Sequence, residues 1–151
     1  MCTVPLPALE KARRPGLVAF LDWARAEGLR LAVVSDYEAG SKLRTLRIDQ
    51  YFSAVVCASD PDVGVFKPNP LGLQVALRRL GVEPAEALYV GDRLEVDGWA
   101  AVAAGMPAAV FSAKAADCPA GVIPIDSWLQ LQNLMQHRVH PAVSRPLCRP
   151  N

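Results

Sequence analysis

The chain has 151 residues, of which 52% are hydrophobic, and this length suits one domain with a buried core. Sixteen Lys and Arg against fifteen Asp and Glu give a net charge of +1, which argues against nucleic acid or an anionic membrane as a partner. No apolar stretch reaches the roughly 18 residues of a membrane-spanning helix, and the amino end has no secretory signal pattern.

The four cysteines, Cys2, Cys57, Cys118 and Cys148, are far apart and form no CxxC pair. Small secreted domains use a denser cysteine framework to form disulfide bonds. The spacing therefore favours a reducing, cytoplasmic location.

Residues 1–14 contain two prolines and no periodic apolar pattern, so we expect a flexible lead-in. Apolar residues at helical spacing follow Pro15 and end before Gly28, which predicts the first helix. Residues 29–35 (LRLAVVS) are apolar on both alternating faces, as in a parallel strand with helices on both sides. A short helix over 39–46 is then expected.

Residues 53–58 (SAVVCA) predict a second buried strand. The next helix begins with Asn69 as a cap and ends at Gly81. A third strand over 87–90, a helix of small residues over 96–104 and a fourth strand over 108–111 are expected to follow.

A final helix is expected after Asp126, with Trp128, Leu131, Leu134 and Met135 facing inward. Residues 137–151 are rich in proline and have little to bury, so we expect a disordered tail. Strands that alternate with helices predict an α/β core domain over 15–136, with a doubly wound parallel sheet.

Ligands of such sheets bind at the carboxyl ends of the strands. Ser35 and Asp36 follow the first predicted strand, Lys67 follows the second, and Asp92 and Asp97 follow the third. A hydroxyl and an ammonium group can bind a phosphate, while paired carboxylates are typical ligands of Mg²⁺. The sequence thus predicts, at one edge of the sheet, a phosphate site formed by Ser35, Asp36 and Lys67 beside a metal site formed by Asp92 and Asp97.

Each signal also has a structural explanation. Ser35 and Asp36 suit an ordinary turn, and Lys67 alone suits a solvated surface position. Asp97 alone suits the amino end of a helix, where a negative charge is favourable. The order and spacing of VVS, KPNP and VGDxxxxD followed by AAGM argue for a common site. Neither a GxGxxG motif nor a P-loop motif is present.

With these motifs, the chain resembles the haloacid dehalogenase-like (HAD) hydrolase superfamily over roughly residues 15–135. The resemblance implies that Ser35 binds the transferring phosphoryl group and that Lys67 steadies the nucleophile and the phosphate. It also implies that Asp92 and Asp97 are the metal-binding acids and that Mg²⁺ is the cofactor.

The family attacks its substrate with an aspartate in a DxDx[TV] motif, at the end of a strand that precedes the other motifs. In residues 1–34 only Asp22 is available, and it lies within the first predicted helix, with Ala24 where the second aspartate belongs. Without a nucleophile covalent catalysis cannot proceed. We therefore expect the chain to be a poor catalyst, and we expect that the chain or its gene model is truncated.

The resemblance also implies that the missing strand lies in the centre of the sheet, between the strands of Ser35 and Asp92. Either these two strands pair directly, or a gap of about 10 Å separates them. A gap would leave two unpaired backbone edges, which invite self-association or a partner strand. Many members of the family also have a cap domain that chooses substrates, and we expect this chain to lack it.

Two residues depart from the family pattern: Asp36 stands where Asn is frequent, and Arg93 follows the metal aspartate where a small residue is common. Asp36 adds negative charge beside the phosphate, which Arg93 could offset. His137, His140 and Cys148 form a weak metal pattern near the predicted tail, which we interpret as having no functional role.

We therefore hypothesise the core of a Mg²⁺-dependent phosphatase for a small phosphorylated metabolite. The alternative is a non-catalytic module that binds a phospho-ligand or metal, and a third possibility is a composite site with a partner chain. The residues do not separate a phosphatase from a dehalogenase, although Lys67 with two acids favours phosphoryl transfer.

Overall fold

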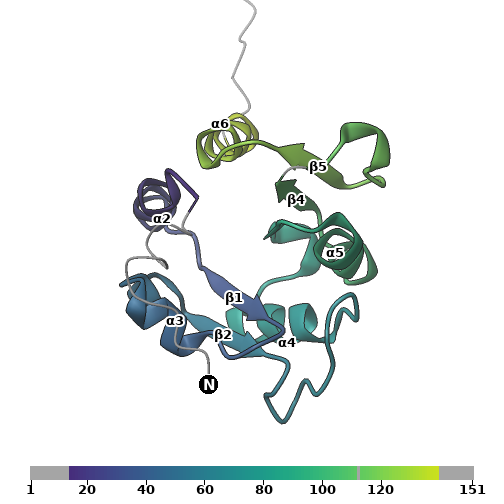
Figure 1. The fold of residues 1–151 in the computed structure, drawn as a ribbon. Helices are drawn as coiled ribbons and strands as arrows, with labels where there is room; N and C mark the ends of the chain where they lie inside the picture. Colours follow the sequence, from purple (N-terminus) through teal and green to yellow (C-terminus); the bar gives the residue numbers. More distant parts are fainter. Residues whose placement is uncertain (1–13, 112, 140–151) are drawn as a thin grey trace, which may run out of the picture.

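The computed structural model describes residues 14–111 and 113–139, and its strands are parallel, with helices on both faces (Figure 1). The helices are α2 (Leu17–Ala26), α3 (Gly40–Thr45), α4 (Leu71–Leu80), α5 (Trp99–Ala103) and α6 (Trp128–Val139). The strands are β1 (Ala32–Ser35), β2 (Ala54–Cys57), β3 (Tyr89–Gly91), β4 (Ala108–Phe111) and β5 (Val122–Ile125). Short helical turns are η1 (Asp49–Tyr51), η2 (Pro84–Glu86), η3 (Leu94–Gly98) and η4 (Ala115–Asp117).

Strand β4 shows why the sheet is covered on both sides. Ala108 and Val110 pack with residues of α4 and α5, whereas the alternate residues Ala109 and Phe111 pack with α2 and α6. All four side chains are buried. Successive side chains of a strand point to opposite faces, so this continuous apolar run requires helices above and below. The predicted α/β fold with a doubly wound parallel sheet is confirmed.

The strands form two separate groups rather than one continuous sheet. Strand β1 pairs with β2, and β4 pairs with β3 and β5, all in parallel. Within the described residues, β1 and β3 do not pair with each other, so each leaves one backbone edge without a strand partner. The direct pairing considered from the sequence is therefore excluded.

Burial agrees with an open position between β1 and β3. The side chains of both strands are only partly buried, although their residues are mostly apolar. Strand β4, with a neighbour on each side, is fully buried. Nothing among the described strands covers the two inner edges, and solvent reaches side chains that a central strand would shield.

The elements lie close to their predicted positions, with two instructive differences. Strand β5 was not predicted, because Pro124 interrupts its apolar run; proline is tolerated here since β5 lies at the edge of its sheet. The helix predicted over 96–104 begins instead as the π-type turn η3 and continues as α5. This turn positions Asp97.

The helix ends follow the expected side-chain chemistry in part. The amide oxygen of Asn69 accepts the N–H of Leu71 at 3.0 Å, as predicted for the start of α4. At the start of α6 the hydroxyl of Ser127, not Asp126, accepts the N–H of Gln130. Leu134, predicted to face inward, is 39% exposed, whereas Leu131 is fully buried.

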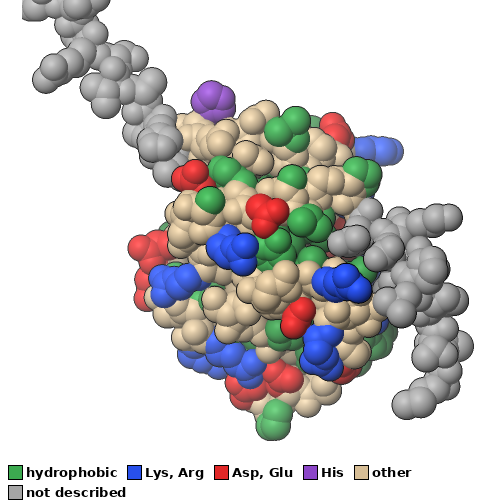
Figure 2. Space-filling view, turned by 90° about the vertical axis from the view of Figure 1, so that its left-hand side faces the viewer, with side chains coloured by type: hydrophobic (Ala, Val, Ile, Leu, Met, Phe, Trp, Pro, Cys, Tyr) green, Lys and Arg blue, Asp and Glu red, His purple; other side chains and the backbone are tan. Residues whose placement is uncertain are grey.

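The expected lead-in and tail fall mostly on residues 1–13 and 140–151, which lie outside the described residues, as do His140 and Cys148. Helix α6 continues to Val139, beyond the predicted boundary at 136. None of the helices in the described part of the chain is long and apolar enough to cross a bilayer. Acidic and basic side chains are interspersed on the face shown in Figure 2, in keeping with the net charge of +1.

Candidate active site

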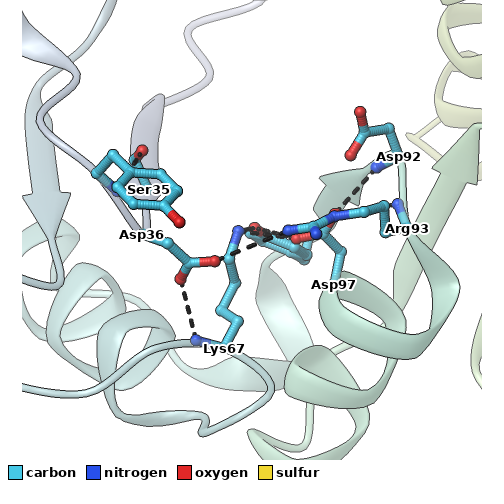
Figure 3. Close-up of polar contacts among 8 residues, drawn as sticks. Ser35, Asp36, Lys67, Asp92, Arg93 and Asp97 are labelled. Atoms are coloured by element: carbon cyan, nitrogen blue, oxygen red, sulfur yellow. Dashed lines mark hydrogen bonds and ion pairs between the residues drawn. The ribbon is translucent and has the colours of Figure 1, made fainter.

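Five predicted residues lie at the carboxyl ends of the strands. Ser35 ends β1 and Asp36 follows it, Lys67 lies in the loop between β2 and α4, Asp92 follows β3, and Asp97 lies in η3. The side chain of Lys67 points from its loop toward Asp97, and Asp36 lies on the opposite side of Lys67 from Asp92 (Figure 3). The structure thus brings the three chain segments together at the carboxyl ends of the strands, as their order in a parallel sheet requires. We call these five residues the rim.

Lys67 and Asp97 form a buried ion pair. The Lys67 Nζ lies 2.8 Å from Asp97 Oδ1, and the two side chains are only 11% and 5% exposed. Nζ also donates to the hydroxyl of Tyr89 at 3.0 Å, and that hydroxyl donates to Asp97 Oδ1 at 3.2 Å. Three groups from the loop, from β3 and from η3 therefore share one hydrogen-bonded triangle, in which Lys67 is held rather than solvated.

The triangle keeps both charges in place. Burial by itself would lower the pKa of Lys67, but Tyr89 and Asp97 together raise that pKa above its ordinary value. Burial would likewise raise the pKa of Asp97, yet the bonds from Lys67 and from the backbone bring that pKa below its ordinary value. Burial raises the pKa of Tyr89 to about 12, so its hydroxyl stays protonated and able to donate.

The second carboxylate oxygen of Asp97 orders the turn that carries Asp92. Asp97 Oδ2 accepts the N–H of Asp92 and the N–H of Arg93, both at 3.1 Å. A carboxylate accepting several hydrogen bonds is stabilised in its charged form. Asp97 thereby uses both oxygens on protein donors, and it fixes the backbone from which the Asp92 side chain extends.

The close approach of Asp97 explains Gly91. A Cβ on Gly91 would lie 2.3 Å from the Cβ of Asp97, a distance that real atoms do not adopt. Gly91 does not have a positive φ, so its backbone conformation does not explain the glycine. Glycine is required because a side chain would displace Asp97 from under the strand end.

The turn η3 directs Asp97 back toward β3. The carbonyl of Arg93 accepts the N–H groups of Val96, Asp97 and Gly98, of which the bond from Asp97 is the shortest at 2.7 Å. Wider turns of this kind occur frequently at functional sites. Gly98 fits because a Cβ there would meet the side chain of Leu94 at 2.7 Å.

Asp36 ties the first and second loops of the rim together. Its Oδ1 accepts the backbone N–H of Lys67 at 3.0 Å, and its Oδ2 lies 3.9 Å from the guanidinium of Arg93. The sequence predicted that Arg93 offsets the negative charge of Asp36. The two side chains do form an ion pair, but it is long and the Arg93 side chain is 58% exposed. Asp36 acts as a loop connector, and the Ser35 Oγ accepts the N–H of Tyr37 at 3.2 Å.

The carboxyl of Asp92 is exposed and available for a ligand. Among the described residues, no group of three or more His, Cys, Asp or Glu is placed to hold a metal ion. Mg²⁺ is commonly held by one or two carboxylates, with water and phosphate oxygens completing the shell. The open oxygens of Asp92 fit that role, whereas both oxygens of Asp97 already accept protein hydrogen bonds.

A shallow hollow of about 310 Å³ lies beside Asp92. Its lining comes from the start of η3 and from the segment after β4, and it includes Arg93 and Lys114. The lining combines these two cations with three carboxylates, those of Asp92, Glu95 and Asp117, so the hollow has no excess of positive charge to attract an anion.

Sequence reasoning missed Tyr89, which appeared only as a strand residue. Tyr89 lies two residues before Gly91, against which Asp97 packs, and this spacing was the available signal because alternate residues of a strand share a face. Asp22, the poor nucleophile candidate, lies on α2, where its carboxylate accepts the hydroxyl of Tyr51 at 2.6 Å. It takes no part in the contacts of the rim.

Comparison with known proteins agrees with this geometry. The family model described as "haloacid dehalogenase-like hydrolase" matches residues 7–105. A glyceraldehyde 3-phosphate phosphatase of Methanopyrus kandleri is 41% identical over 95 residues, which cover 61% of this chain and 40% of the relative. Phosphoglycolate phosphatase 1 of Pseudomonas aeruginosa is 29% identical over 101 residues, covering 65% of this chain and 36% of the relative.

Among solved structures, a HAD phosphatase from Thermococcus onnurineus superposes with a TM-score of 0.75 and 26% identity, covering 89% of this chain and 66% of that one. The chain spans less than half the length of the curated relatives named above. The match covers the β1, Lys67 and Asp92 segments of the rim. The protein belongs to the haloacid dehalogenase-like hydrolases.

Proposed function

We propose that this chain supplies the phosphate- and Mg²⁺-binding part of a phosphatase site for a small phosphorylated metabolite. The observation that carries the proposal is the buried Lys67, held charged between Asp97 and Tyr89 at the same rim as Ser35. A fixed ammonium group suits an anion whose charge must be balanced at a defined place.

In this proposal each residue has one task. The hydroxyl of Ser35 donates to a phosphoryl oxygen, and Lys67 balances the charge of the phosphoryl group. Asp92 holds Mg²⁺, while Asp97, expected from the sequence to be a second ligand, acts chiefly by positioning Lys67 and the Asp92 backbone. Mg²⁺, when bound, neutralises charge that develops on the phosphoryl oxygens.

The names of the relatives support the substrate class. Two phosphatases that match this chain are named for glyceraldehyde 3-phosphate and for phosphoglycolate, both small phosphorylated molecules. We propose a ligand of that class. The free thiols of Cys57 and Cys118 fit the cytoplasmic location expected from the sequence.

The nucleophile is the missing part of this proposal. No strand among the described residues fills the position between β1 and β3, and the resemblance assigns the nucleophilic aspartate to that strand. We propose that an additional strand, supplied by a partner chain, completes the site there. Alternatively, two copies of the chain associate through the unpaired edges of β1 and β3.

The proposal is tested by titrating inorganic phosphate into the full chain with and without Mg²⁺, using calorimetry. Binding should require Mg²⁺ and should weaken by about tenfold or more in Lys67→Met, because a charge-assisted hydrogen bond is lost. Asp92→Asn should abolish the Mg²⁺-dependent binding. Lys42→Met, at an exposed position of α3, is the matched control and should bind as the parent does.

A second function, binding without turnover, is favoured by the open position between β1 and β3. Incubation with p-nitrophenyl phosphate and Mg²⁺ separates the two. Turnover that Asp92→Asn abolishes supports the phosphatase in this chain alone. Phosphate binding without turnover supports the binding module, and turnover that appears only after a partner is added supports a composite site. Failure to bind phosphate at all would reject both functions.

A further inference from the structure

Two aromatic side chains stand exposed beside the candidate site. Tyr37 is 72% exposed and Phe66 is 61% exposed, although both are large apolar groups. Their ring centroids lie 6.1 Å apart with planes inclined by 37°. This is within the usual range for interacting aromatic pairs. The rings belong to different loops, so the contact is formed by the tertiary structure.

The same hydrogen bonds that build the rim also hold this aromatic pair. Tyr37 directly follows Asp36, and its N–H donates to the Ser35 hydroxyl at 3.2 Å. Phe66 directly precedes Lys67, whose N–H donates to Asp36 Oδ1 at 3.0 Å. Each ring is therefore the chain neighbour of a residue of the rim, and the bond between Asp36 and Lys67 keeps the two loops together.

An exposed aromatic pair next to a polar rim suits a ligand that has an aromatic group at one end and an anionic group at the other. Val65, 37% exposed, adds to the apolar character of the second loop. Aromatic faces bind other flat rings in stacked or edge-on arrangements, while an ammonium group binds the anionic end. The pair contributes no charge, so it discriminates by the shape of the organic group rather than by the phosphate.

We infer that Tyr37 and Phe66 form a specificity site that binds the organic part of the ligand and selects phosphoesters bearing an aromatic ring. The inference rests on the proposed phosphate site, and it adds the class of substrate that this site prefers. Because the rings lie on the loops that carry Ser35 and Lys67, the ring and the phosphate of one small molecule are held by the same two loops.

The test compares methylphosphonate with phenylphosphonate, which share the anionic end and differ in the aromatic ring. Both are titrated by calorimetry into the full chain in excess Mg²⁺, next to inorganic phosphate. We expect phenylphosphonate to bind about tenfold more tightly than methylphosphonate, as an added aromatic contact allows. Tyr37→Ala and Phe66→Ala should each remove most of that ratio while the methylphosphonate affinity changes less than about twofold.

The control variant is Leu129→Ala, which removes an equally exposed apolar side chain from α6. It should leave the ratio of affinities unchanged, and Tyr37→Phe should do the same because the ring is retained. Equal affinity for the two phosphonates, together with phosphate binding, would overturn the aromatic specificity alone. Absence of binding for phosphate and both phosphonates would overturn the phosphate site itself, and the inference with it.

Discussion

Asp97 holds Asp92 by its backbone: the Oδ2 of Asp97 accepts the N–H of Asp92 at 3.1 Å. The two acids of the GDxxxxD motif therefore have different surroundings. Asp97 is buried and fully hydrogen-bonded, whereas the carboxyl of Asp92 is exposed. Paired carboxylates with such unequal environments suit one ligand residue and one positioning residue.

Removing Lys67 should destabilise the fold as well as weaken the proposed phosphate site. Lys67→Met leaves the buried carboxylate of Asp97 without its cation, and we expect a loss of about 3 kcal/mol in the free energy of unfolding, measured with urea. The double variant Lys67→Met/Asp97→Asn should lose less than the sum of the single losses. Additive losses would show that the pair does not couple. Lys42→Met is the exposed control.

Tyr89→Phe should cost about 1 to 2 kcal/mol of stability, because the hydroxyl bonds both Lys67 and Asp97 in a buried place. Tyr51→Phe is the matched control, since its hydroxyl donates to the half-exposed Asp22 on α2. We expect a smaller loss for that variant in the same denaturation experiment. An equal loss in both variants would contradict a special role for Tyr89.

Gly91→Ala should displace Asp97. A Cβ at position 91 meets the Cβ and carboxyl of Asp97 at 2.3 to 2.7 Å, and relief of such overlap typically costs about 1 to 3 kcal/mol. Phosphate affinity in Mg²⁺ should fall as well. The comparison is Gly28→Asn, at an open position with φ of 73°, which Asn tolerates. If Gly91→Ala binds phosphate normally, the packing against Asp97 is unimportant for the site.

The ion pair predicts a particular dependence of stability on pH. The pKa of Asp97 is lowered by folding, so its contribution is complete above about pH 4 and is lost as the pH falls through the folded-state value. The pKa of Lys67 is raised, so its contribution is complete below about pH 10.4 and is lost as the pH rises further. Urea titrations across pH should show a shallower acid decline in Asp97→Asn. An unchanged decline would assign acid sensitivity to other groups.

Hydrogen exchange should reveal the open edge of β1. Ser35 directs its carbonyl to Ala58, beyond the end of β2. Successive residues of a strand direct their backbone groups to opposite sides, so the N–H of Val33, two residues before Ser35, also faces β2. The N–H groups of Ala32 and Val34 face the open position, and we expect them to exchange faster than that of Val33. A strand bound between β1 and β3 should protect them. Slow exchange at all three positions in the monomeric chain would contradict an open edge.

The sequence by itself determined the order of helices and strands and the membership of the rim. Continuous apolar runs such as β4 require helices on both faces, and residues at the carboxyl ends of parallel strands meet at one edge. Ser35, Lys67 and Asp92 could therefore be placed together from their order alone. Strand β5 escaped prediction because Pro124 lowers strand propensity without forbidding an edge position.

The tertiary structure alone decided what the rim residues contact. The hydroxyl of Tyr89 bridges Lys67 and Asp97 because three separate segments converge, and Tyr37 meets Phe66 because Asp36 joins two loops. Local patterns report which side of a strand or helix a residue occupies, but they carry no information about neighbours distant in sequence. The open edge between β1 and β3 likewise belongs to the assembled sheet, since pairing is a relation between strands and not a property of either one.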